Sequence, residues 1–191
     1  MPYVGEAVVR YTISSVISLI SGTAVMAGFM MVYALISFIG VVLLKQDTRA
    51  WPPVFDAPFL STSLNEFWAK RWHQFLRRTF MVYGGLPCGY ITSFLPIPTA
   101  AKKSIVQIAT VLGAFLASGV FHELTSTAMG HGWNGRVVWY FFMHGGLVIV
   151  ERVWRKISGK RVGGWMGMVW VYFWVAVAGQ FCSEFLFYAS L

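Results

Sequence analysis

The chain has little charge and few acidic residues: 12% of its 191 residues are charged, and only seven are Asp or Glu. Hydrophobic residues make up 57% of it, which excludes an ordinary soluble domain. Several runs are too long and too apolar to be core helices of a small globular protein. The sequence therefore predicts an all-α, multi-pass transmembrane helical bundle.

Cysteine is also scarce. Cys88 and Cys182 form no CxxC pair and no set of four metal ligands, so we expect no bound metal. The 15 Lys and Arg residues give a net charge of +8, which in a soluble protein would suggest nucleic acid. Here the cations flank apolar runs, where they fix topology and meet anionic headgroups. We therefore expect membrane lipid, and no nucleic acid, as their partner.

The apolar runs predict about four spans. Residues 11–44 hold no charge and no proline, which indicates one over-long or strongly tilted helix that also acts as a signal anchor. Further spans are expected at 104–128, 137–150 and 165–183. A basic loop is expected at 151–164, before the last span. Residues 45–62, with three prolines, predict an irregular surface loop. Residues 80–95 are apolar, short and rich in glycine, which favours a re-entrant or interfacial segment. If residues 80–95 do not cross the membrane, nearly all cationic loops lie on its cytoplasmic side.

Residues 63–78 (SLNEFWAKRWHQFLRR) are the most informative stretch. Ser63 and Glu66 have the spacing of a capping box, which predicts a helix start. Trp68 and Trp72 then fall on an apolar face, and the opposite face is polar and mostly cationic. This pattern is typical of an amphipathic helix at the membrane interface. Such a helix either contributes to a site or only anchors its neighbours.

Three ionisable residues lie inside predicted spans: His122, Glu123 and His144. An ionisable group in a span is costly to bury, which makes each one a functional candidate. The two histidines should lie at similar depth, so a shared polar pocket is one possibility. A histidine satisfied by a neighbouring backbone carbonyl is the other. His122-Glu123 begins like a zinc-binding HExxH motif, but Ser126 replaces the second histidine, so zinc hydrolysis is not expected.

A neutral histidine in an apolar pocket is suited to removing a proton from a hydroxyl near neutral pH. A second donor is needed where negative charge builds on an attacked carbonyl. A cationic face at the cytoplasmic border can hold a phosphate-bearing substrate. Together these features indicate acyl transfer from a coenzyme A thioester to a lipophilic alcohol.

Three ordered motifs carry a family resemblance. They are Ser63-Leu64-Asn65-Glu66-Phe67-Trp68-Ala69-Lys70-Arg71-Trp72-His73, Ser118-Gly119-Val120-Phe121-His122-Glu123-Leu124, and Phe141-Phe142-Met143-His144-Gly145 with Glu151. From about residue 51 onward the chain resembles the wax synthase-like branch of the membrane-bound O-acyltransferase superfamily. The Trp51-Pro52-Pro53 and Arg77-Arg78-Thr79-Phe80 stretches are similar to its fungal members, which often acetylate terpenoid alcohols.

The resemblance implies a role for each matched residue. His122 would be the general base on the acceptor hydroxyl, and His73 a polarising or orienting group. Trp68, Arg71 and Trp72 would shape the acyl-CoA site, and we add Glu123 and His144 as candidate substrate-binding residues. The resemblance also implies that no covalent acyl-enzyme is required. We expect acetyl-CoA or another acyl-CoA as co-substrate, and no bound cofactor or metal. The expected location is the endoplasmic reticulum membrane.

The chain departs from the family in length. We treat residues 1–191 as a single wax synthase-like domain without the N-terminal spans usual in the family, so a partner subunit that supplies spans is one expectation. The leading hypothesis is an acetyltransferase in secondary metabolism. The alternatives are a long-chain wax-ester synthase and a non-catalytic or truncated membrane partner protein.

Overall fold

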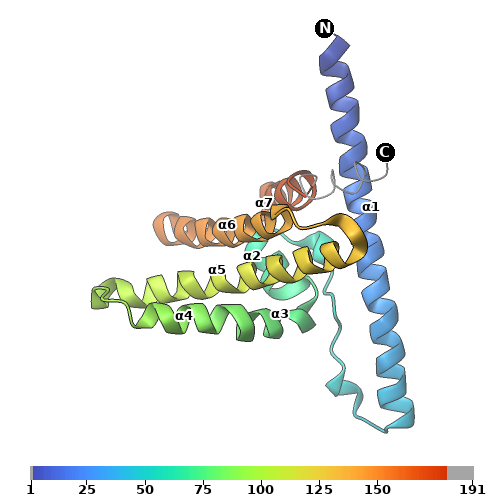
Figure 1. The fold of residues 1–191 in the computed structure, drawn as a ribbon, viewed down its shortest axis with the longest axis horizontal. Coiled ribbons are helices and arrows are strands. Elements are labelled where there is room, and N and C mark those ends of the chain that lie inside the picture. Colours follow the sequence, from blue (N-terminus) through green and yellow to red (C-terminus); the bar gives the residue numbers. More distant parts are fainter. Residues whose placement is uncertain (1, 180–191) are drawn as a thin grey trace.

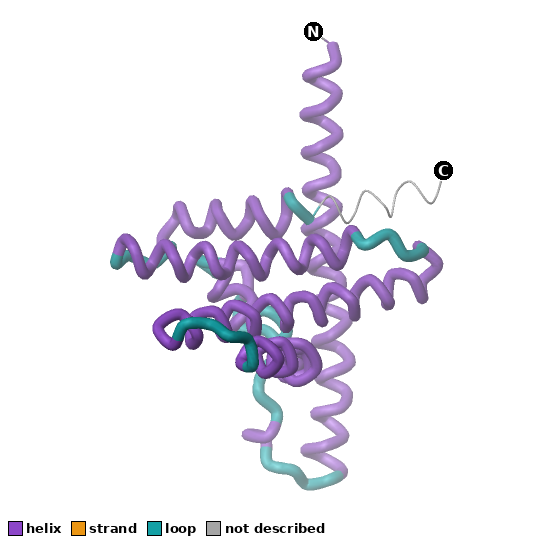
Figure 2. The backbone as a smooth tube through the Cα atoms, turned by 60° about the vertical axis from the view of Figure 1, so that its left-hand side comes forward, coloured by secondary structure: helices purple, strands orange, loops and turns teal. Residues whose placement is uncertain are grey.

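The computed structural model describes residues 2–179, and within that range the regular secondary structure is entirely helical. Helix α1 (Pro2–Phe38) continues into a π-helical turn, η1 (Ile39–Leu43), which confirms the single helix predicted for residues 11–44. Figures 1 and 2 both show α1 crossing the other helices at a steep angle, and these form a layered stack beside it.

Three helical segments of residues 2–179 are long and apolar enough to cross a membrane: Val8–Leu43, Thr99–Gly130 and Arg136–Ser158. A shorter apolar segment, Gly164–Val177, contains α7 (Gly164–Tyr172) and η7 (Phe173–Val177) and begins the fourth predicted span. The rest of that span, with Cys182, lies outside the described residues. The prediction of an all-α membrane protein is confirmed.

Helix α6 (Arg136–Ser158) is longer than predicted. The basic loop expected at 151–164 is wrong for residues 151–158, which continue the helix until Gly159 ends it with a left-handed φ of 69°. Arg and Lys are good helix formers, so a cluster of cations does not by itself end a helix. The cations of this stretch therefore project from a rigid element.

The segment that follows His73 is helical in spite of its glycines. The helical backbone runs through α3 (Gln74–Phe80), η5 (Met81–Gly85) and α4 (Leu86–Ser93), and the prediction that residues 80–95 form a re-entrant or interfacial segment stays a prediction. This helical run lies along α5 (Thr99–Ser126) in both views. A Cβ atom on Gly84 would collide with the backbone carbonyl of Gly113. The glycines thus permit close helix packing instead of breaking the helix.

The single helix predicted for residues 63–78 is also wrong. The start is as expected, since the Glu66 backbone N–H donates to Ser63 Oγ over 3.0 Å at the first turn of α2 (Leu64–Glu66). After η4 (Phe67–Arg71), however, Trp72 is extended with ψ of 129°. The break is stabilised from the preceding loop, because the backbone N–H of Gln74 donates to the Val54 carbonyl over 3.1 Å. Residues on either side of it therefore do not share helical faces.

The buried core is built around α2 and η4. Leu64 and Phe67 pack with Val148 of α6 and Val171 of α7, and Leu64 is completely buried. The segment expected at the membrane surface is thus enclosed by the helices that follow it. Its apolar side chains hold the fold together, and the adjoining residues form the walls of a cavity.

Candidate functional site

His73 and His122 lie side by side in the structure, with their ring centroids 6.2 Å apart. His73 stands at the break between η4 and α3, and His122 lies in the last third of α5. The break therefore directs His73 toward α5, which a continuous helix over residues 63–78 would not do. The two residues predicted to carry the chemistry are brought together.

His73 is enclosed by aromatic side chains. It is only 7% exposed, and its ring lies against Phe29, Phe55, Trp72 and Phe75 at centroid distances between 5.5 and 6.5 Å. Burial lowers the pKa of His73 from its ordinary value to about 4. The imidazole is therefore neutral near pH 7, with one nitrogen able to donate a hydrogen bond and the other able to accept one.

His122 stacks face to face on Phe141 of α6, with centroids 4.6 Å apart and planes at 10°. Its Nε2 atom is buried and has no hydrogen-bond partner among residues 2–179. A buried polar atom without a partner is unusual and calls for an explanation. Within the described part of the chain, this nitrogen therefore remains available to accept a proton.

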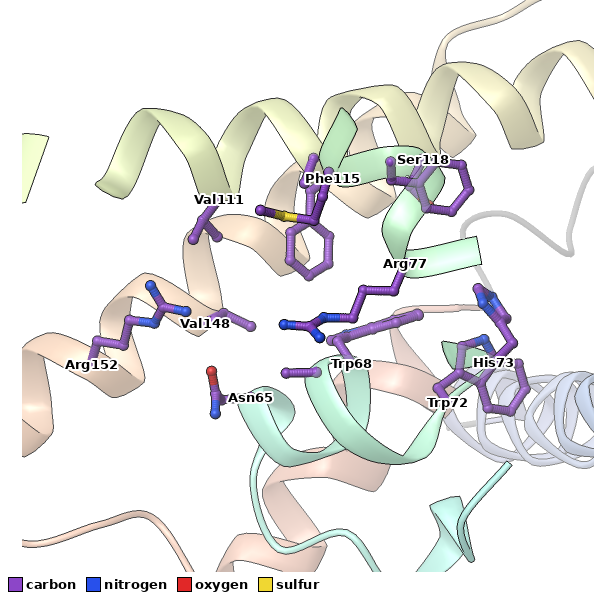
Figure 3. A pocket seen from close by; sticks show the side chains of 14 residues that line it. Asn65, Trp68, Trp72, His73, Arg77, Val111, Phe115, Ser118, Val148 and Arg152 are labelled. Atoms are coloured by element: carbon purple, nitrogen blue, oxygen red, sulfur yellow. The ribbon is translucent and has the colours of Figure 1, made fainter. Parts of the chain in front are cut away.

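A cavity of about 130 Å³ leads to His73 (Figure 3). Its apolar middle is formed by Trp68, Phe115 and Val148, and His73 lies at one end. Arg152 lies at the opposite end, beside Asn65 in the view of Figure 3. The full lining is Asn65, Trp68, Ala69, Trp72, His73, Arg77, Phe80, Met81, Val111, Ala114, Phe115, Ser118, Val148 and Arg152. The cavity thus joins Arg152 at one end to His73 at the other, between largely apolar walls that the guanidinium of Arg77 also enters.

Two of the predicted substrate-binding residues, Trp68 and Trp72, line this cavity. Trp68 also contacts Phe115 and Phe141, at ring distances of 5.9 and 5.6 Å. Its indole Nε1 is buried without a hydrogen-bond partner in the described part of the chain. Trp68 therefore combines an apolar wall with an unused donor.

Arg71 occupies a different position from the one that its motif suggests. It is absent from the cavity lining formed by residues 2–179. Its guanidinium binds the Glu66 carboxylate over 2.8 Å and donates to the Asp56 carbonyl over 3.0 Å. A hydrogen bond from the Thr62 backbone N–H is the main factor that lowers the pKa of Glu66. Arg71 thus ties the 56–57 loop to η4.

Glu123 is 1% exposed and caps a helix. Its carboxylate accepts hydrogen bonds of 2.9 to 3.2 Å from four backbone N–H groups at the start of α6, namely those of Asn134, Gly135, Val137 and Val138. A carboxylate is favourable there because the N-terminal amides have no partners within the helix. The hydrogen bonds of this carboxylate thus go to the backbone of residues 134–138.

His144 is completely buried on α6. Its Nδ1 is 2.9 Å from the Tyr140 carbonyl oxygen, and its ring lies 5.5 Å from that of Trp68. The cavity lining within residues 2–179 includes neither His144 nor His122. Each of them contacts a residue of the lining, His122 beside His73 and His144 beside Trp68. Both span histidines therefore lie next to the cavity wall, and His122 is the one that adjoins His73.

Sequence reasoning missed two cationic residues of the cavity, Arg77 and Arg152. Arg77 was placed on a polar face under the assumption of an unbroken helix, and Arg152 was placed in a loop. In Figure 3 the guanidinium of Arg77 points along the cavity toward the end where Arg152 lies. One signal for Arg77 was its place in the cationic end of the 63–78 stretch, close after His73.

Comparisons with known proteins bear on this geometry. Residues 51–144 match the membrane bound O-acyl transferase family. An acyl-CoA–sterol O-acyltransferase of Arabidopsis thaliana is 32% identical over 57% of this chain and 30% of its own length. The acetyltransferase atnC of Arthrinium sp. is 24% identical over 68% and 31%, respectively. A long-chain-alcohol O-fatty-acyltransferase of Simmondsia chinensis is 32% identical over 56% and 30%.

The aligned part covers about 30% of the length of each of these three relatives. No solved structure is significantly similar to the chain. The predicted resemblance to the membrane-bound O-acyltransferase superfamily is confirmed. The matched region contains η4 and the whole of α5, and it ends at His144.

Proposed function

We propose that this chain, whose residues 51–144 match the membrane-bound O-acyltransferase family, transfers an acyl group from acyl-CoA to the hydroxyl of a lipophilic alcohol. The observation that carries the proposal is the pairing of His73 and His122, 6.2 Å apart, with His73 at the end of a cavity whose opposite end is cationic. A general base, a second imidazole and a site for an anionic donor are the parts that this reaction requires.

In the proposed reaction, Nε2 of His122 accepts the hydroxyl proton of the alcohol as its oxygen attacks the thioester carbonyl carbon. The neutral His73 donates a hydrogen bond to the carbonyl oxygen, where negative charge develops. The C–S bond then breaks, and the coenzyme A sulfur takes the proton back from His122. The products are an ester and free coenzyme A, and no acyl group is attached to the protein.

Acetyl is the proposed acyl group. The similarity to the protein named acetyltransferase atnC of Arthrinium sp. supports this choice.

The proposed acceptor is a terpenoid or similar alcohol of secondary metabolism, reached from the lipid phase. The aromatic side chains of Phe75 and Phe121, each nearly half exposed, lie beside the histidine pair and suit an apolar acceptor. We place the protein in the endoplasmic reticulum membrane, with the cationic end of the cavity on the cytoplasmic side, where acyl-CoA is found.

The test is incubation of membranes that contain the protein with labelled acetyl-CoA and a lipid extract, followed by identification of the labelled ester. We expect wild-type membranes to form an ester and His122→Ala membranes to lose its formation at equal protein levels. Unchanged ester formation in that variant would reject the mechanism and favour a non-catalytic membrane partner. If palmitoyl-CoA outcompetes acetyl-CoA, the protein is instead a wax-ester synthase.

A further inference from the structure

The long first helix brings one side chain to the histidine pair. The ring centroid of Phe29 lies 6.2 Å from that of His73, and the same ring meets Phe75 edge-on with centroids 5.5 Å apart. Phe29 belongs to α1, which lies outside the matched residues 51–144. The family match therefore assigns no role to this residue, although it borders the candidate site.

Helix α1 turns one stripe of residues toward the rest of the chain around Phe29. Gly22, Met26, Phe29 and Tyr33 are half-buried, whereas the residues between them (23–25, 27–28 and 30–32) are exposed. Spacings of four, three and four residues place these side chains on one face of a helix. One turn after Phe29, the hydroxyl of Tyr33 donates to the Pro52 carbonyl. This hydrogen bond ties α1 to the loop before α2 and thereby holds Phe29 in position.

The histidine pair has partly exposed rings on either side of this contact. Phe75 is 48% exposed, and its ring lies 6.5 Å from that of His73. Phe121 is 46% exposed, and its ring lies 5.5 Å from that of His122. An apolar alcohol that approaches the pair from the lipid phase on this side meets these rings, and it meets Phe29 where α1 borders His73.

We infer that Phe29 is a specificity-determining residue for the acceptor alcohol. This inference rests on the proposed function. An alcohol whose oxygen reaches His122 brings its hydroxyl-bearing carbon, and the substituents of that carbon, beside the rings around His73. A primary alcohol has one carbon substituent at that position, whereas a secondary ring alcohol has two. The bulk of the Phe29 ring therefore favours alcohols with an unhindered hydroxyl.

The test compares two terpenoid alcohols. Geraniol has a primary, unhindered hydroxyl, and menthol has a secondary hydroxyl on a substituted ring. Membranes that contain the full chain receive labelled acetyl-CoA and either alcohol, and kcat/KM for ester formation is measured. We expect the wild type to prefer geraniol and Phe29→Ala to reduce this preference about tenfold or more, since a methylene group in an apolar pocket changes such ratios roughly 10- to 200-fold. Phe29→Leu, which keeps a larger apolar side chain, should lie between the two.

Phe38→Ala is the matched control, because Phe38 is 59% exposed at the end of the same helix. It should keep the wild-type preference. An unchanged preference in Phe29→Ala would overturn the inference, as would equal use of both alcohols by the wild type. The same shift in Phe38→Ala would also overturn it, because the effect would then belong to α1 as a whole.

A second measurement needs no turnover. A photoreactive diazirine analogue of geraniol is activated in the membranes without acetyl-CoA, and mass spectrometry measures its attachment to the peptides that contain Phe75 and Phe121. We expect unlabelled geraniol to compete with this labelling in the wild type and in Phe29→Ala, and menthol to compete in Phe29→Ala alone. If this pattern is found but no ester forms, the inference stands and the proposed function fails. Equal competition by menthol in both proteins, or labelling that neither alcohol reduces, would reject the inference.

Discussion

The Glu151 carboxylate accepts a hydrogen bond of 2.7 Å from the backbone N–H of Leu64, and both residues are buried. The same carboxylate accepts the N–H groups of Asn65 and Trp170. One side chain of α6 therefore fixes the first turn of α2 and also holds α7. Because α2 leads directly into η4, this contact sets the position of Trp68 on the cavity wall.

Replacement of Glu151 tests this contact. Glu151→Ala leaves three donors without an acceptor, and we expect a loss of about 3 kcal/mol or more in the free energy of unfolding. Glu151→Gln keeps one acceptor oxygen and should lose less. Thermal unfolding in detergent measures both, with Asp47→Asn in the exposed loop as control. Equal melting temperatures for Glu151→Ala and the wild type would contradict this role.

Glu123 makes a similar prediction for the other end of α6. Glu123→Ala removes the acceptor of four backbone N–H groups, and we expect the turn before α6 to open. Trypsin should then cleave after Arg136 several times faster than in the wild type, whereas Glu123→Gln should give an intermediate rate. If Glu123 instead contacts substrate and has no capping role, cleavage stays slow and only the KM for a substrate rises.

Hydrophobic patterns sufficed to predict the helical membrane fold, the long first helix and the helix start at Ser63. These features depend on local composition and on capping chemistry between near neighbours. The break at Trp72 was not predictable, because it depends on a hydrogen bond from Gln74 to the distant Val54 carbonyl. Tertiary contacts of this kind override local helical propensity.

The candidate site was also predictable only in part, because some positions of its side chains depend on tertiary contacts. His73 and His122 were identified by motif and by the rarity of ionisable groups in spans. The separate positions of Arg71 and Arg77 follow from the break between them, which turns one toward the 56–57 loop and the other toward the cavity. Similarly, Arg152 lines the cavity because α6 continues beyond the predicted span.

The buried His73 predicts a pH dependence of stability. Its pKa is about 4 in the folded protein and near 6.5 when unfolded, so the unfolded chain binds the proton more readily. Above about pH 6.5, the free energy of unfolding therefore does not depend on the protonation of His73. As the pH drops from 6.5 toward 4, that free energy falls by about 3 kcal/mol at most. Chemical unfolding of wild type and His73→Gln at several pH values measures the difference.

The difference between the two proteins isolates His73, because the other histidines titrate in both. We expect the stability of His73→Gln to decline less steeply than that of the wild type over this window. Parallel pH profiles would show that His73 carries no abnormal burial cost.

The contrast between Arg71 and Arg77 tests the cavity itself. Arg77 points its guanidinium along the cavity, whereas Arg71 binds Glu66 and the 56–57 loop. We expect Arg77→Gln to raise the KM for acetyl-CoA about tenfold or more, since a charged partner of the donor is lost. Arg71→Gln should instead lower the melting temperature and change that KM little.

Initial rates at varied acetyl-CoA concentration, together with thermal unfolding of the same preparations, separate the two effects. The residues lie six positions apart on one chain and carry the same charge, so a difference cannot arise from net charge alone. If Arg71→Gln raises the KM while Arg77→Gln does not, the donor does not occupy this cavity. That result would support the motif-based prediction that Arg71 binds acetyl-CoA, even though Arg71 lies outside the cavity lining.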